Sequence, residues 1–87
     1  MGTLHWVAFP PERQDLLHQL LALLEPADAV LFDGAGLAFL RHQRGLAHFS
    51  HLTPYCLEEH HQGCKTITAQ QLAELSMHYK NTITWYP

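Results

Sequence analysis

The stretch Ala29-Val30-Leu31-Phe32 decides the fold, because it places four apolar residues in a row between Asp28 and Asp33. Strands with one solvated face alternate apolar and polar residues, whereas a parallel strand covered on both faces does not. The stretch therefore predicts a central parallel strand. The following Asp33-Gly34-Ala35-Gly36 predicts a tight turn rather than a phosphate-binding loop, since it lacks G-x-G-x-x-G and a P-loop lysine.

Strand and helix patterns precede this central strand. The β-branched and aromatic segment Thr3–Phe9 predicts a first strand that ends at Pro10-Pro11. Leucines at three- to four-residue spacing predict a helix over Pro11–Leu24, with Pro11 in its first turn. The apolar stripe of that helix is expected to comprise Leu16, Leu17, Leu20, Leu21, Leu23 and Leu24.

The same alternation continues after the central strand. A helix over Ala69–Tyr79 is expected, capped by Thr68, with its apolar face formed by Leu72, Leu75, Met77 and Tyr79. The other predicted elements are a short helix over Leu37–Arg41, a strand over Pro54–Leu57, a helical turn over Glu58–Gln62, a strand over Thr66–Thr68 and a last strand over Thr82–Trp85.

Alternating strands and helices imply right-handed crossovers and a mainly parallel sheet with helices on both faces. The chain has 87 residues, which is the size of one domain. We therefore expect residues 1–87 to form a single α/β domain that is Rossmann-like in the loose sense.

Composition narrows the functional classes. Hydrophobic residues make up 47% of the chain, which excludes intrinsic disorder, and charged residues only 15%, which favours a surface covered by a partner. The formal net charge of −3 argues against direct nucleic-acid binding. No apolar run is long enough for a membrane span, and no signal peptide is apparent, so a cytoplasmic protein with free thiols is expected.

The two cysteines, Cys56 and Cys64, are the candidates for sulfur chemistry. They are eight residues apart, so the C-x-x-C spacing of thioredoxin-like proteins is absent. A sulfur carrier needs an exposed thiolate with a lowered pKa. Cys56 lies in an apolar strand, close to Glu58 and Glu59, and is expected in the core. Cys64 is expected to be more exposed, with only Lys65 as an adjacent cation.

Two further sets of residues suggest sites. Tetrahedral zinc accepts mixed sulfur and nitrogen ligands, but Gly63 would interrupt a helix carrying the candidate ligands, so no metal and no cofactor are predicted. The candidate ligands are Cys56, His60, His61 and Cys64. Aromatic side chains near both ends of the sequence are expected either in the core or at a subunit interface, and they are Trp6, Phe9, Trp85 and Tyr86.

Four stretches carry a resemblance that covers essentially the whole chain. They are Thr3-Leu4-His5-Trp6, Asp28 through Asp33-Gly34, Tyr55-Cys56-Leu57-Glu58-Glu59 with Gly63, and Leu72 through Lys80 with Trp85. In this order and at these separations, they resemble the DsrH/TusB family, subunits of bacterial sulfur-relay complexes in the DsrEFH-like group. The chain departs from the family at Glu59, often Asp, at Gln62, which replaces an Arg, and at Ala35, which replaces a frequent Val.

The resemblance implies assembly with TusC-like and TusD-like (DsrF-like and DsrE-like) paralogues into a heterohexamer. That complex passes persulfide sulfur toward 2-thiolation of the tRNA wobble uridine, and the sulfur-carrying cysteine belongs mainly to the TusD-like subunit. Some relatives have a further cysteine near the first helix, but no cysteine precedes Cys56 here. The resemblance therefore implies a structural subunit without catalytic activity of its own.

Three alternatives stay open. The chain could be a sulfurtransferase that acts through Cys64 or Cys56. It could belong to a DsrEFH-type complex of dissimilatory sulfur oxidation. It could also be a homo-oligomeric binding module, with a metal as one candidate ligand.

Overall fold

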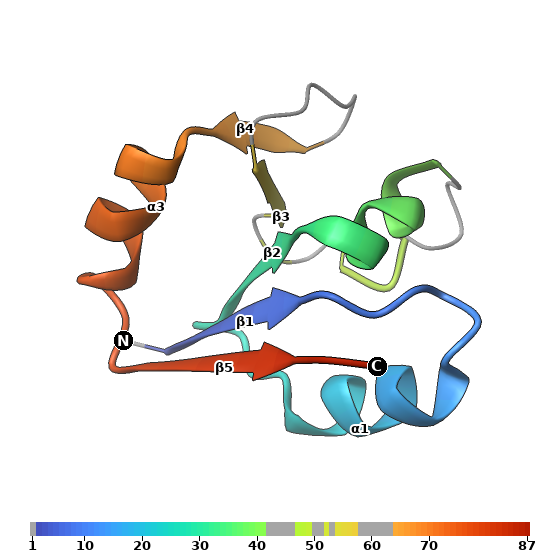
Figure 1. Cartoon of the computed structure of the whole chain (residues 1–87). Coiled ribbons are helices and arrows are strands. Elements are labelled where there is room, and N and C mark those ends of the chain that lie inside the picture. Colours follow the sequence, from blue (N-terminus) through green and yellow to red (C-terminus); the bar gives the residue numbers. More distant parts are fainter. Residues whose placement is uncertain (1, 42–46, 50–51, 53, 58–63) are drawn as a thin grey trace.

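The computed structural model describes residues 2–41, 47–49, 52, 54–57 and 64–87 (Figure 1). Within those residues, strands and helices alternate along most of the chain. The elements are β1 (Thr3–Val7), α1 (Gln14–Leu23), β2 (Ala29–Phe32), the 3₁₀ helix η1 (Gly34–Arg41), β3 (Pro54–Leu57), β4 (Lys65–Ile67), α3 (Ala69–Ser76) and β5 (Asn81–Trp85).

The strands form one parallel sheet in the order β4-β3-β2-β1-β5. All four residues of β2 are buried, which confirms the predicted central parallel strand and the α/β class. After β4 the chain passes through α3 and returns to pair β5 with β1, in the register Leu4↔Thr82. The first and last strands therefore lie side by side, and β4 and β5 form the two edges (Figure 1).

Each face of the sheet packs against helices, and β2 contributes to both cores. Val30 and Phe32 face the α1 side, whereas Leu31 faces the α3 side. Four phenylalanine rings pack against one another on the α1 side, with centroid separations of 5.3–6.0 Å. The buried residues on that side are Val7, Phe9, Leu17, Leu20, Val30, Phe32, Phe39, Leu40, Phe49, Leu52 and Cys56. Those on the α3 side are Leu4, Ala29, Leu31 and Ile67.

Helix α1 begins at Gln14, so the predicted start at Pro11 is wrong. The N–H of Arg13 donates to the carbonyl of Pro10, and this tight turn precedes the helix. Leu17 and Leu20 are buried as expected, but Leu23 is 56% exposed. The predicted stripe was too wide because α1 touches the sheet along one side only.

Helix α3 has the predicted cap and a different end. The side chain of Thr68 accepts from the N–H of Gln71, whose side chain accepts from the N–H of Thr68, which is a complete capping box. The helix ends at Ser76 rather than Tyr79, and Met77 is 84% exposed instead of packing inward. The helix ends early because the chain must reach the start of β5 at Asn81. The N–H of Lys80 already donates to the carbonyl of Gly2, next to β1.

The remaining boundaries differ from the predictions by a few residues. Strand β1 ends at Val7 rather than Phe9, β4 lies one residue earlier than predicted, and β5 already begins at Asn81. The predicted helix over Leu37–Arg41 is the second part of η1. The predicted turn over Glu58–Gln62 lies outside the described residues. In the part of the chain that is described, no helix has the length and apolarity needed to cross a bilayer.

The turn after β2 packs closely against the end of β1. The N–H of Asp33 donates to the carbonyl of Val7 (3.1 Å), and the N–H of Gly34 donates to Oδ1 of Asp33 (2.8 Å). Gly34 has a φ of 55°, in the left-handed region. At Gly36 a Cβ atom would collide with the carbonyl of Val7. The two glycines are therefore required for different reasons, one for its dihedral angle and one for space.

This difference makes a testable prediction. Gly36→Ala should lower the free energy of unfolding by more than about 2 kcal/mol, because the methyl group forces η1 away from β1. Gly34→Ala, whose Cβ meets nothing within 4 Å, should cost only about 1 kcal/mol, for the left-handed backbone. Urea denaturation of both variants measures the difference, and equal losses would contradict the close approach at Gly36.

Candidate functional site

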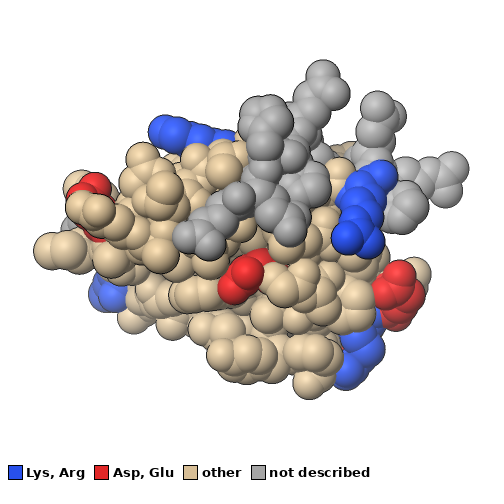
Figure 2. Space-filling model, turned by 45° about the horizontal axis from the view of Figure 1, so that its top comes forward, with Lys and Arg blue, Asp and Glu red and all other residues tan. Residues whose placement is uncertain are grey.

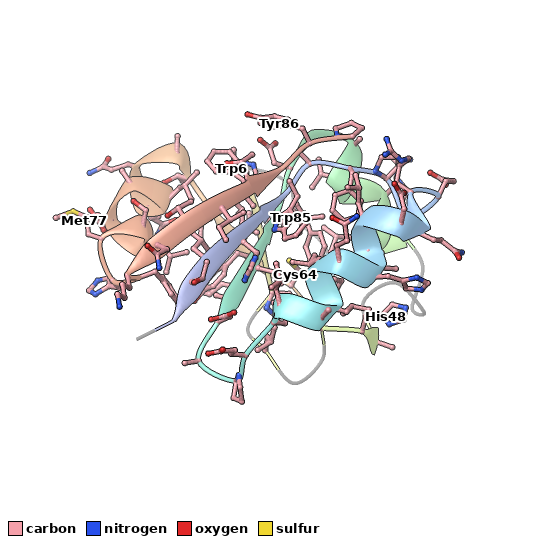
Figure 3. All side chains as sticks on the ribbon, turned by 90° about the horizontal axis from the view of Figure 1, so that it is seen from below. Trp6, His48, Cys64, Met77, Trp85 and Tyr86 are labelled. Carbon is pink, nitrogen blue, oxygen red and sulfur yellow. The ribbon has the colours of Figure 1, made fainter. Side chains whose placement is uncertain are left out.

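The two thiols lie near each other on the face of the sheet that α1 covers. Cys56 is in β3, pairs in register with Thr66 and is fully buried. Cys64 lies in a bend just before β4, is half-buried and packs against the same core (Figure 3). The thiols of Cys64 and Cys56 lie close enough to interact, and Sγ of Cys56 is 3.5 Å from Oγ1 of Thr66. The structure thus brings together two residues eight positions apart in the sequence.

This environment disfavours the thiolate of Cys64. Burial raises the pKa of the Cys64 thiol well above its ordinary value, and the interaction with Cys56 raises it further. The expectation that Cys56 belongs to the core is confirmed, while Cys64 is less exposed than expected. A thiol with a raised pKa is a poor acceptor of sulfane sulfur at neutral pH, because the thiolate is the reacting form.

The four metal-ligand candidates are only partly placed. Cys56 and Cys64 are adjacent, while His60 and His61 lie outside the described residues. Among the residues that are described, no cluster of three or more His, Cys, Asp or Glu side chains could hold a metal ion.

A second polar cluster, absent from the sequence-based candidates, centres on His5 and Asp28, which are both buried. Nε2 of His5 lies 3.0 Å from Oδ2 of Asp28, and the indole Nε1–H of Trp85 donates to Nδ1 of His5 (3.1 Å). Because indole nitrogen only donates, Nδ1 must be unprotonated, and Nε2–H donates to the carboxylate. Asp28 also accepts from the N–H groups of Thr3 (2.8 Å) and Glu25 (3.1 Å).

This cluster has the residues of a catalytic His–Asp pair, but its histidine has no nitrogen atom free to act on a substrate. Both nitrogen atoms of His5 are occupied, one by Trp85 and one by Asp28, so neither can take a proton from a substrate. A hollow of about 340 Å³ opens beside His5 and Asp28 near Glu25 and Lys80. The cluster joins β1, the entry to β2 and the end of β5, which is a structural task. A polar residue at a buried strand position, His5, was its only sequence signal.

The four aromatic candidates separate into two groups. Phe9 is fully buried and contacts Phe39, so it belongs to the core and cannot supply an interface. Trp85 is partly buried against the α1-side core and hydrogen-bonded to His5. Tyr86 is 71% exposed, and Trp6 lies at the sheet surface beside α3. Of the four candidates, Tyr86 therefore offers the most aromatic area to a partner, and the partly buried Trp6 and Trp85 offer less (Figure 3).

The surface near β5 is weakly charged. Asn81, Thr82, Ile83 and Thr84 are all exposed, and β5 pairs with β1 alone. A groove of about 380 Å³ runs between α3 and β1, lined by Trp6, Leu72, Thr82 and small residues of α3. Figure 2 shows one face of the molecule, where charged side chains are few and scattered. The uncharged β-branched edge and this groove form the surface that we call the β5 side.

Asp28 supplies a testable prediction about stability. Burial raises the pKa of its carboxyl, but the hydrogen bonds from Thr3, Glu25 and His5 outweigh burial, so the net pKa lies below the ordinary value of 3.8. Asp28→Ala should lower the free energy of unfolding at pH 7 by about 2–4 kcal/mol, because three donors lose their partner. Asp15→Ala, which removes an exposed ion pair with Arg13, serves as the control and should change stability little, because solvent screens that pair.

The pH dependence follows from the same shift. A lowered carboxyl pKa contributes stability that is fully present above the unfolded pKa and is lost as pH falls through the folded pKa. The stability difference between wild type and Asp28→Ala should therefore shrink in acid. Urea titrations between pH 7 and pH 3 test this, and a difference that stays constant down to pH 3 would contradict the assignment.

No protein-family model matches the chain, and no curated protein matches it significantly. A proposal about function therefore depends on three features. They are the four stretches that resemble the DsrH/TusB family, the burial and raised pKa of the thiols, and the uncharged edge of the β5 side.

Proposed function

We propose that the chain is a structural subunit of a cytoplasmic sulfur-relay complex of the TusBCD type, with a Rossmann-like domain related to the DsrEFH group. In this role it contributes contact area and leaves persulfide chemistry to TusC-like and TusD-like partners. The complex would supply sulfur for 2-thiolation of the tRNA wobble uridine. The support comes from the sequence resemblance and from two features of the structure.

The observation that carries the proposal is the state of the thiols. Cys56 is fully buried, and Cys64, the more accessible of the two thiols, has a raised pKa. A persulfide carrier must present a reactive thiolate to both its donor and its acceptor. A chain whose described thiols are held in this way fits a supporting role better than a carrier role.

The surface gives independent support for a partner. An unpaired edge strand without charge tends to associate, and monomeric proteins usually protect such edges with charged residues or proline. Within β5, Asn81–Trp85, there is neither. The exposed Leu23, Met77 and Tyr86 add apolar area elsewhere, and a chain this short buries a limited share of its own surface.

The sulfurtransferase alternative, acting through Cys64 or Cys56, has weaker support because of the same thiol environment. The sulfur-oxidation alternative would use the same surfaces with other downstream partners. A homo-oligomer would use the β5 side between identical chains.

The first test replaces both cysteines in the assembled complex. With Cys56→Ala and Cys64→Ser together, copurification with TusC-like and TusD-like chains should be preserved. The 2-thiouridine content of tRNA, measured by mass spectrometry, should stay within about twofold of wild type, since the sulfur travels through other subunits. A tenfold loss of thiolation with intact copurification would refute the structural role and favour the sulfurtransferase alternative.

The second test concerns the β5 side. Thr84→Lys adds a charge to the exposed edge and should reduce copurification with the partners at least tenfold, while changing the unfolding free energy by less than about 0.5 kcal/mol. Gln70→Lys adds the same charge on the exposed surface of α3 and serves as the matched control, with little expected effect. Unchanged assembly of Thr84→Lys would exclude β5 as the contact edge.

A further inference from the structure

The thiol pair has a feature that a purely structural role does not use. Cys56 in β3 belongs to the α1-side core, Cys64 in the bend before β4 packs against the same core, and the two thiols interact. One sulfur is sealed from solvent and the other is half-buried. A small reagent can therefore approach the pair from one side only, through Cys64.

We propose that Cys56 and Cys64 form an oxidation site, at which a low-molecular-weight disulfide such as glutathione disulfide converts the two thiols into a reversible intrachain disulfide. The bond would link β3 to the entry of β4. This inference stands apart from the proposed sulfur-relay function and holds for any partner of the chain.

The reaction proceeds by two exchanges. The thiolate of Cys64 attacks one sulfur of glutathione disulfide, the S–S bond breaks, and one glutathione leaves and takes up a proton. The thiol of Cys56 then loses its proton to solvent and attacks Sγ of Cys64, which expels the second glutathione. The protein loses two hydrogen atoms and two electrons, and the disulfide reagent is reduced to two thiols.

Cys64 lies outside the paired residues of β4, so its backbone can adjust without breaking the strand pairing. A disulfide requires Cα atoms about 4.4–6.8 Å apart. Cys64 lies in a bend, and the paired register of β4 starts only at Lys65, opposite Tyr55. An adjustment at Cys64 therefore leaves the alignment of the two strands unchanged. Oγ1 of Thr66, 3.5 Å from Sγ of Cys56, is placed to stabilise the attacking sulfur.

The rate should depend strongly on pH. Burial raises the pKa of Cys64, and Cys56 raises it further, so little thiolate exists at neutral pH. Below that pKa, the rate of exchange should rise about tenfold for each unit of pH. The site would therefore respond to sustained oxidation rather than to a brief pulse.

The experiment uses the full chain, reduced and shown to be folded by circular dichroism, and incubated with excess glutathione disulfide at pH 7 and pH 8. Intact mass should fall by about 2 Da, both thiols should resist alkylation, and digestion should yield one peptide pair linked through Cys56 and Cys64. Oxidation should be about tenfold faster at pH 8. A protein that stays reduced, retains glutathione or forms only intermolecular disulfides would overturn the proposal.

Single variants test the order of attack. Cys56→Ala should retain one glutathione on Cys64, because no second thiol resolves it. Cys64→Ser should stay unmodified, because Cys56 is sealed, and glutathione on Cys56 in this variant would overturn the role of Cys64 as the attacking thiol. Failure in either assay leaves partner assembly and tRNA thiolation untouched, so it is distinguishable from failure of the proposed function.

Discussion

The carboxylate of Asp28 is the constraint on which the arrangement of the strands depends. It accepts hydrogen bonds from Thr3 at the start of β1, from Glu25 after α1 and from the imidazole of His5. His5 in turn accepts from Trp85 at the end of β5. A buried carboxylate costs free energy unless it is fully hydrogen-bonded, so these segments must meet in one geometry. The first, second and last strands are thereby held side by side at one end of the chain's sheet.

Because β5 pairs with β1, the chain must cross from β4 at one edge of the sheet to β5 at the other, and it does so through α3. The earlier connections that the structure describes lie on the α1 side. The two faces consequently differ. The α1 side holds the larger core, with four packed phenylalanine rings and Cys56, and Cys64 packs against it. The α3 side has a smaller core with the groove beside Trp6. The thiols lie on the better-packed side, which explains both the poor accessibility of Cys56 and the raised pKa of Cys64.

This asymmetry bears on the proposed function. Thiols held against the core are unsuited to rapid sulfur transfer, because the thiolate is the reacting form. The β5 edge and the α3 groove remain available for contacts, and a charge-poor edge strand is most stable when another chain covers it. The proposed structural subunit of a sulfur-relay complex, with the proposed oxidation site at its thiol pair, would account for both features. Its sulfur-carrying partner would then be recognised through contact area rather than through an active site.

The sequence by itself determined the elements, since hydrophobic periodicity and capping are local. The run Ala29–Phe32 sufficed to predict a buried parallel strand, and Thr68 marked the start of α3. Local patterns could not reveal which strands are neighbours, so the meeting of His5 with Trp85, and of Cys56 with Cys64, came only from the tertiary structure. The same holds for the exposure of Leu23 and Met77. Periodicity shows that a residue is apolar on a given face, whereas burial depends on whether another element packs there.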